Sequence, residues 1–94
     1  YRKRERKEVY LSVNIPSSSS DEREKTAEKL TSKVRELFPY ADLRRLHTNG
    51  SATDAVFNIS VRSAGELVEL MDILKQNFKD GDFTFVDQPR LPGL

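Results

Sequence analysis

The sequence predicts an α+β fold in which a four-stranded antiparallel sheet carries two helices on one face. Two stretches alternate apolar with polar side chains, two others place apolar side chains at three- and four-residue steps, and an Asn-Gly pair lies near the middle of the chain. Period two is typical of a half-buried strand, and the longer period is typical of an amphipathic helix. With 94 residues, 36% of them hydrophobic and 33% charged, the chain has the composition of one small globular domain.

The first strand is predicted over Glu8–Ile15, in the stretch EVYLSVNI. Alternation assigns its side chains to two faces. Those expected to face the core are Val9, Leu11, Val13 and Ile15, and those expected on the other face are Tyr10, Ser12 and Asn14. Pro16 and the serines at 17–20 are expected to end the strand, because proline donates no ladder hydrogen bond.

The first helix is predicted to follow the serine run. Ser19 and Glu22 have the spacing of a capping box, and further acidic side chains lie in the first turns, at the positive end of the helix. The expected apolar stripe consists of Ala27, Leu30, Val34, Leu37 and Phe38. Pro39 disfavours helical backbone in the residue before it, so the helix is predicted to end near Leu37 or Phe38.

A hairpin is predicted next, because both residues of Asn49-Gly50 accept a positive φ. Its first arm, about Leu43–Thr48, is polar and is expected at an edge of the sheet. Its second arm, about Asp54–Val61, alternates. Its expected inward residues are Ala55, Phe57, Ile59 and Val61, and its expected outward residues are Val56, Asn58 and Ser60.

The second helix is predicted to begin at Ser63–Glu66, where SAGE also has the spacing of a capping box. The residues expected on its buried face are Leu67, Leu70, Met71, Leu74 and Phe78. The turn KDGD then leads to a last short strand over Phe83–Asp87.

The predicted order is strand, helix, strand, strand, helix, strand. Two right-handed β-α-β crossovers joined by a hairpin give the ferredoxin-like arrangement, also called ACT-like. The domain is expected to span residues 8–87. A basic segment over residues 1–7 precedes it, and a tail over residues 88–94 with two prolines and a glycine follows it.

The sequence does not indicate catalysis or metal binding. The chain has no cysteine, and its one histidine, His47, has no second imidazole to complete a transition-metal site. The segment Asp80–Asp82 is not followed by acidic residues at EF-hand spacing, and Glu66, Glu69 and Asp72 are expected as charges on a helix surface. The acidic residues beside the serine run would repel an anion. We therefore expect a non-catalytic domain with no cofactor and no metal.

The uncovered face of the predicted sheet indicates association with a protein partner or with a second copy. Tyr10, Val56 and Val86 are expected to form a small apolar spot among polar residues that include Asn58. Arg44 and Arg45 lie on the neighbouring polar strand. These six residues are the predicted interaction surface.

The alternative hypothesis is a small RNA-binding domain, because the RNA-recognition motif has this topology and stacks bases on aromatic residues of its first and third strands. Tyr10 is suitably placed on the first strand. Its counterparts on the third strand are Val56, Asn58 and Ser60, which cannot stack on a base. The hypothesis therefore depends on Tyr10 together with Arg44 and Arg45.

The opening stretch YRKRERKE is basic. It carries Arg2, Lys3, Arg4, Arg6 and Lys7 against two glutamates, a net charge of +3 from five minus two, whereas the whole chain has a net charge of +1. Membrane proteins place Lys and Arg on the cytoplasmic side of a span, with an aromatic residue at the boundary. Tyr1, which stands where a complete protein would have Met, fits that order. We expect the domain at the cytoplasmic face of a membrane, as part of a longer protein.

This basic junction followed by a βαββαβ domain resembles the C-terminal cytoplasmic region of MgtC/SapB-type bacterial membrane proteins. The resemblance covers residues 1–87 and concerns architecture. It implies an ACT-like domain with a regulatory or assembly role in a membrane protein linked to magnesium homeostasis. ACT domains that bind amino acids usually keep a glycine between the first strand and the first helix. This sequence has Pro16 and four serines there, so the resemblance carries no ligand site over.

Overall fold

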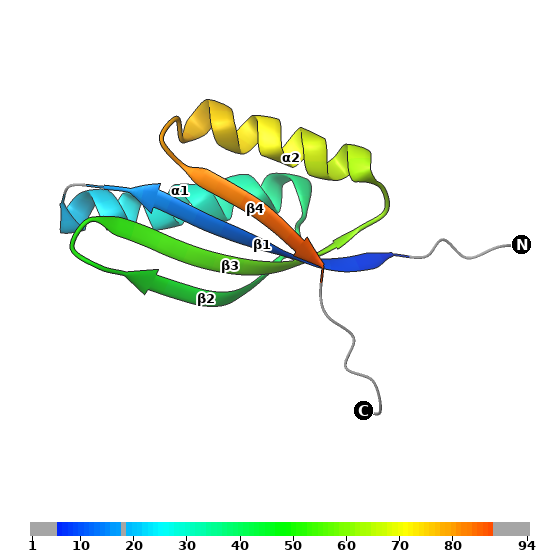
Figure 1. Cartoon of the computed structure of the whole chain (residues 1–94), viewed down its shortest axis with the longest axis horizontal. Coiled ribbons are helices and arrows are strands. Elements are labelled where there is room, and N and C mark those ends of the chain that lie inside the picture. The colour runs from blue at the N-terminus through cyan, green and yellow to red at the C-terminus, as the bar shows by residue number, and fades with distance from the viewer. Residues whose placement is uncertain (1–5, 18, 88–94) are drawn as a thin grey trace, which may run out of the picture.

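A computed structural model describes residues 6–17 and 19–87 of the chain. Its elements, in chain order, are β1 (Lys7–Pro16), α1 (Ser20–Leu37), β2 (Asp42–Thr48), β3 (Ala52–Val61), α2 (Ala64–Asn77) and β4 (Asp82–Asp87) (Figure 1). Each predicted strand is present, with bounds within two residues of those expected. The basic residues Arg2, Lys3 and Arg4 and the predicted tail lie outside the described residues.

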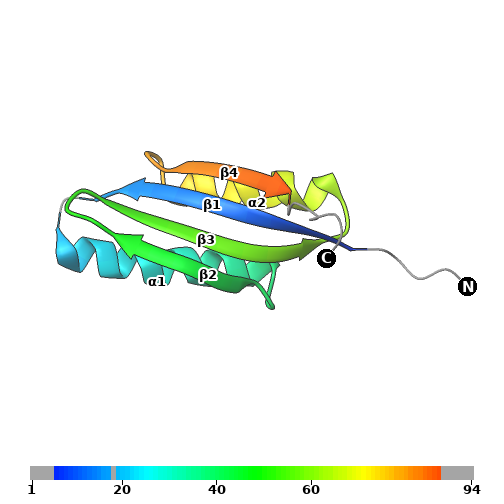
Figure 2. The ribbon, with the colours of Figure 1, turned by 60° about the horizontal axis from the view of Figure 1, so that its bottom comes forward.

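The four strands form one sheet in the order β2-β3-β1-β4, and every neighbouring pair is antiparallel. Both helices pack on the same face, which leaves the other face of the sheet uncovered by any element of the described residues (Figures 1 and 2). The predicted α+β, ferredoxin-like fold is confirmed. The polar strand β2 lies at an edge, as expected from its composition.

The central pair β1–β3 supplies half of the core. The two strands pair along their whole lengths, from Lys7 opposite Val61 to Pro16 opposite Ala52. Their buried apolar residues are Val9, Leu11, Val13, Ile15, Ala55, Phe57, Ile59 and Val61, the eight that alternation predicts. The helices add Leu30 and Val34 from α1 and Leu70 and Leu74 from α2, and their C-cap residues add Phe38 and Phe78. Burial of side chains of this size contributes about 1.5–3 kcal/mol each, so this layer holds the helices to the sheet.

The start of α1 follows the prediction. Ser19 is the N-cap, and its Oγ accepts a hydrogen bond from the Glu22 N–H at 3.1 Å. The helix ends at Leu37, and the Phe38 N–H still donates to the Val34 carbonyl at 2.9 Å. The stop before Pro39 is therefore as expected.

The start of α2 differs from the prediction. Ser63 is the N-cap but makes no side-chain capping bond, and the Glu66 carboxylate accepts from the Arg62 N–H at 2.6 Å. The predicted capping box at Ser63–Glu66 is wrong, because the carboxylate reaches one residue further back, to the backbone that leaves β3. Glu66 thus fixes the entry to α2 and is more than a surface charge.

The hairpin is present, but its turn differs from the predicted one. The loop has three residues, 49–51, and the Asn49 side-chain oxygen accepts from the Ser51 and Ala52 N–H groups at 2.8 and 2.9 Å. The φ of Gly50 lies outside the left-handed region. The Asn-Gly pair therefore makes the predicted hairpin without a positive φ at Gly50, because the Asn49 side chain satisfies the backbone donors of the loop.

We expect Asn49→Ala to lower the free energy of unfolding by about 1 kcal/mol, because two backbone N–H groups lose their acceptor. Gly50→Ala is the control, since no atom lies within 4 Å of a Cβ added there. Its effect is expected to stay within about 0.5 kcal/mol. Urea denaturation of both variants checks this. A larger loss for Gly50→Ala than for Asn49→Ala would contradict the role given to the Asn49 side chain.

We expect Thr53→Val to raise the free energy of unfolding by about 1 kcal/mol. Thr53 has an exposed fraction of 0%, and its hydroxyl has no hydrogen-bond partner among the described residues. Valine fills the same volume without a buried unpaired group. The control is Thr31→Val, because the Thr31 hydroxyl donates to the Ala27 carbonyl at 3.0 Å and its loss brings no such gain. Thermal or urea unfolding of both variants measures the two changes in stability. Destabilisation by Thr53→Val would show that its hydroxyl has a partner.

Candidate interaction surface

The open face of the sheet, the side that neither helix covers, is the candidate surface. Tyr10 lies on β1, one of the two central strands of the sheet. The strand register places it opposite Asn58 on β3 and opposite Val86 on β4. Tyr10 and Asn58 are partly buried by their neighbours, whereas Val86 is 49% exposed. Directly opposed residues share one face of a sheet, so Tyr10 and Val86 are neighbours on the open face.

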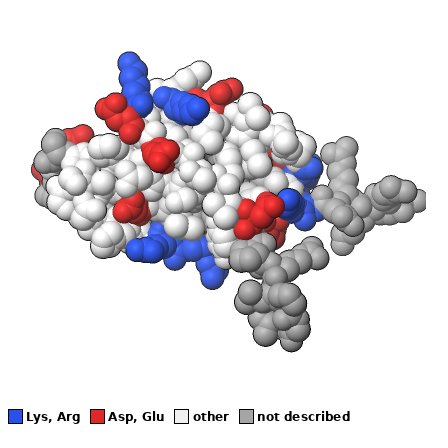
Figure 3. All heavy atoms as spheres, viewed as in Figure 1, with Lys and Arg blue, Asp and Glu red and all other residues white. Residues whose placement is uncertain are grey.

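The next row of the same face is also mostly uncharged. Ser12 lies opposite Val56 on β3 and Thr84 on β4. Val56 is thus diagonal to Tyr10, and the three predicted apolar residues Tyr10, Val56 and Val86 are brought together. In the space-filling view, atoms of uncharged residues occupy most of the middle of the face (Figure 3). The patch is small and is surrounded by hydroxyl and amide groups.

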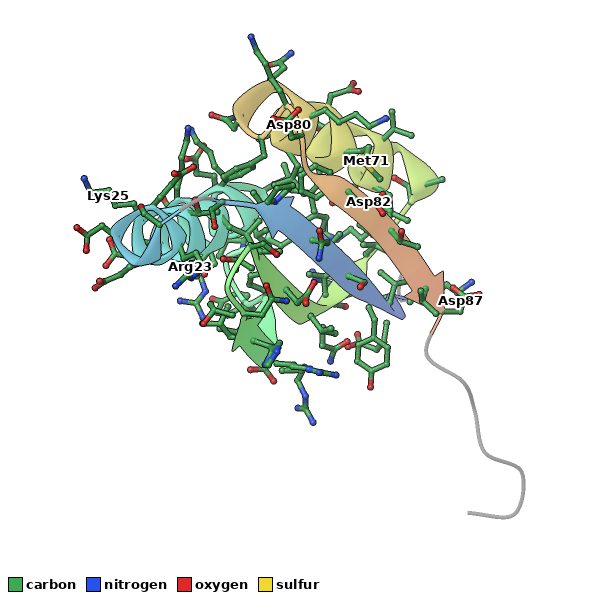
Figure 4. The ribbon with its side chains drawn as sticks, turned by 60° about the vertical axis from the view of Figure 1, so that its left-hand side comes forward. Arg23, Lys25, Met71, Asp80, Asp82 and Asp87 are labelled. Carbon is green, nitrogen blue, oxygen red and sulfur yellow. The ribbon has the colours of Figure 1, made fainter. Side chains whose placement is uncertain are left out.

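The two borders of the open face carry opposite charges. On the β2 border, Arg45 lies opposite Val56 and His47 lies opposite Asp54. Blue atoms of Lys and Arg follow the edge of the molecule where β2 runs (Figure 3). On the β4 border, Asp82 begins the strand opposite Asn14 of the open face, whereas Asp87 ends it opposite the buried Val9 and so lies on the helix side (Figure 4). The open face therefore carries Arg45 and His47 along one edge strand and Asp82 on the other.

The structure separates the two arginines that were predicted together. The register of β2 against β3 shifts between Leu43 and Arg45, which leaves Arg44 as the unpaired residue of a bulge. The Arg44 guanidinium binds the Asp42 carboxylate at 3.1 Å. Arg45 alone lies on the open face in line with the apolar patch. The Arg44 side chain is instead paired with Asp42 at the edge of the sheet.

The basic segment 1–7 overlaps the first strand. Lys7 is the first residue of β1, and its ammonium lies 3.1 Å from the Asp87 carboxylate. Arg6 precedes the strand and is exposed. The predicted boundary after residue 7 is therefore one residue late, since pairing with Val61 draws Lys7 into the sheet. Among the described residues, no helix is both long and apolar enough to cross a membrane.

A hollow of about 480 Å³ lies where α1 begins, beside the turn between α2 and β4. Its lining includes Lys25, Lys29 and Lys79, and also Asp21, Glu22 and Asp80. Lys25 and Asp80 come to it from different elements (Figure 4). The lining charges balance, and the Lys29 ammonium lies 5.4 Å from the centroid of the Phe78 ring. These charges lie between α1 and the end of α2. Because both signs are present, the hollow does not favour a cationic or an anionic ligand.

The polar row next to the apolar patch contains His47, Asp54, Asn14 and Asp82 in that order across the sheet. The Asn14 amide donates to the Asp54 carboxylate. Within residues 6–17 and 19–87, no group of three or more His, Cys, Asp or Glu side chains is arranged to hold a metal ion. Asn14 therefore lies between the two acids as a hydrogen-bonding spacer.

Two exposed residues were not anticipated. Tyr40 is 95% exposed, and Leu46, on the helix side of the edge strand β2, is 48% exposed. The signal for Tyr40 was present in the sequence, because Phe38 and Ala41 take the inward positions around the turn after α1. An aromatic residue between them has no inward position left.

No family model matches the sequence, and no curated protein matches it. Among solved structures, the chain is similar to one titled "De novo designed protein Foldit4", at 11% identity and a TM-score of 0.57. The alignment covers 89% of this chain and 99% of the designed one. At this identity the similarity concerns the fold alone. The chain is a βαββαβ domain of the ferredoxin-like fold.

Proposed function

We propose that this chain is a non-catalytic assembly domain that self-associates through the open face of its sheet, within the cytoplasmic part of a membrane protein. The observation that carries the proposal is the uncharged centre of that face. Tyr10, Val56 and Val86 lie together on the side that no described element covers. An exposed apolar patch of this kind contributes to stability only when a partner buries it.

The charges at the borders favour a second copy as the partner. In a face-to-face pair with its two-fold axis along the strands, the β2 border of one copy lies over the β4 border of the other. Arg45 and His47 would then face the strand that contains Asp82. The same rotation brings β1 over β3, so the two apolar patches meet. Sheets packed in this way cross at about −30°.

The cytoplasmic and membrane-linked part of the proposal is supported by the basic opening segment and by the resemblance to MgtC/SapB-type proteins. In that setting, self-association of the domain would regulate or assemble the membrane protein to which it belongs. The fold itself is compatible with many functions.

RNA binding is the second candidate, because Arg45 and Tyr10 share the open face. A stacking aromatic and a cation on one face are the minimum for contact with a single strand. However, the β3 positions on that face are Val56, Asn58 and Ser60, and Phe57 is buried at 0% exposure. The open face therefore offers one stacking residue, which favours a protein partner.

We expect the chain to show concentration-dependent dimerisation in analytical ultracentrifugation. Val86→Lys should raise the dissociation constant by about tenfold or more, the equivalent of about 1.4 kcal/mol, since it places a charge in the patch. Val68→Lys is the matched control, because Val68 is a 60% exposed valine on α2. A wild-type chain that stays monomeric, or equal effects of the two variants, would contradict self-association through the sheet. Salt-sensitive binding of an oligonucleotide that shifts Tyr10 signals would support the RNA alternative.

The membrane-linked part is tested by fractionating cells that express the longer protein. We expect the protein to remain in the membrane fraction after a high-salt wash, because a span, unlike an electrostatic contact, resists salt. Recovery in the soluble fraction would contradict a membrane-spanning parent. It would leave the self-association proposal unaffected.

A further inference from the structure

The turn between α1 and β2 holds an aromatic side chain in water. The Ala41 N–H donates to the Phe38 carbonyl at 3.0 Å, which closes a tight turn after the helix. Phe38 and Ala41 face the core, with 6% and 5% of their surfaces exposed. Tyr40, which lies between them, is 95% exposed. The core therefore makes no use of this ring.

Tyr40 lies beside a shallow hollow that carries more basic than acidic side chains. A depression of about 270 Å³ is lined by Tyr40, Arg6, Arg62, Ser60 and Glu66. The two arginines are far apart in the sequence and meet here because β1 begins and β3 ends at this end of the sheet. A ring, two guanidinium groups, a hydroxyl and one carboxylate thus border one small concave area.

The acidic side chains at this end are mostly engaged. Glu66 accepts from the Arg62 backbone N–H, and Asp87 binds Lys7. Asp42 binds Arg44, and Glu36 lies 3.4 Å from Lys33.

The free charges that remain at this end are mostly positive. Within the described part of the chain, the guanidinium groups of Arg6 and Arg62 have no ion-pair partner, nor has Arg35 in the last turn of α1. Two acids oppose them, the exposed Glu8 and Glu66, whose carboxylate accepts only from a neutral backbone N–H. Three unpaired cations against these two acids leave the end positive.

The same end receives the basic segment of the sequence. β1 starts there, and the ends of β3 and β4, the end of α1 and the start of α2 lie near it (Figure 1). Lys and Arg atoms appear at this end in the space-filling view (Figure 3). Arg6, Arg35 and Arg62, from separate parts of the sequence, thus lie at one end of the molecule.

We infer that this end, defined by Arg6, Tyr40 and Arg62, binds a surface of anionic lipid headgroups. Arginine binds phosphate oxygens through its planar fork, and each cation near an anionic leaflet strengthens binding by about fivefold. Tyrosine prefers the boundary between headgroups and hydrocarbon. The inference rests on the proposed membrane-linked role for the source of the phosphates. It adds the orientation of the domain, which would stand on this end of the sheet and leave Tyr10, Val56 and Val86 clear of the bilayer for a second copy.

The experiment is co-sedimentation of the full chain with vesicles of phosphatidylcholine alone and of phosphatidylcholine mixed with phosphatidylserine. We expect binding to the anionic vesicles only. The double variant Arg6→Gln, Arg62→Gln should weaken it by about 25-fold, from about fivefold for each charge. The matched control is Lys25→Gln, Lys79→Gln, which removes two cations from the hollow at the opposite end of the molecule. It should change binding by less than about twofold, because those cations lie away from the headgroup contact.

A fluorescent reporter tests the contact itself. The chain contains no tryptophan, so Tyr40→Trp introduces a single one at the proposed contact. Its emission should shift to shorter wavelength when anionic vesicles are added. Tyr10→Trp, on the open face, should show no shift. A shift at position 10 but not at position 40 would overturn the proposed orientation.

Three other results would overturn the inference. They are equal binding to both vesicle types, equal losses for the two double variants, and release of the chain by inorganic phosphate at a concentration that leaves the ionic strength unchanged. The last would identify a site for a free anion. Preference for an oligonucleotide over anionic vesicles would assign the arginines to nucleic acid. Dimerisation without vesicle binding would contradict lipid binding and leave self-association standing. Vesicle binding by a chain that stays monomeric would contradict self-association and leave lipid binding standing.

Discussion

The pairing of β1 with β3 is the constraint on which the rest of the molecule depends. Their register, with Leu11 opposite Phe57, places four apolar residues from each strand on one face. Because side chains alternate, a slip of one residue between the strands would move the four apolar residues of one strand to the other face. Both helices then attach to the face so defined. The position of the edge strands follows, since β2 pairs with β3 and β4 pairs with β1.

The same register determines what remains for function. Burial of Leu11 and Phe57 forces Tyr10, Val56 and Asn58 onto the opposite face, where β4 adds Val86. The patch that we assign to self-association is therefore the complement of the core. The direction of the strands also separates two ends of the domain. Arg6, Arg62 and Tyr40 meet at one end because β1 starts, β3 stops and α1 stops there. One surface can thus face a bilayer while another receives a second copy.

The parts that could be predicted from sequence are those governed by a simple period. Alternation identified the core of β1 and β3, and helical spacing identified Leu30 and Val34 on α1 and Leu70 and Leu74 on α2. Local polar contacts were harder to predict, because several acceptors compete for each backbone donor. The Glu66 carboxylate accepts from the Arg62 N–H in place of the expected capping box with Ser63, and the Asn49 side chain holds the loop of the predicted Asn-Gly hairpin. The separation of Arg44 from Arg45 depends on a bulge, and the meeting of Arg6 with Arg62 depends on tertiary structure. Neither the bulge nor this tertiary contact can be recognised from the local sequence.

The most direct test of the β1–β3 register uses the fact that the chain has no cysteine. Ser12 lies opposite Val56, and opposed residues of antiparallel strands have the Cα separation that a disulfide requires. The double variant Ser12→Cys, Val56→Cys should therefore form an intramolecular disulfide on mild oxidation while the domain keeps its fold. Ser12→Cys, Ala55→Cys, whose side chains point to opposite faces, should stay reduced. A disulfide in the second pair and none in the first would contradict the register, and with it both the core and the surface that derive from it.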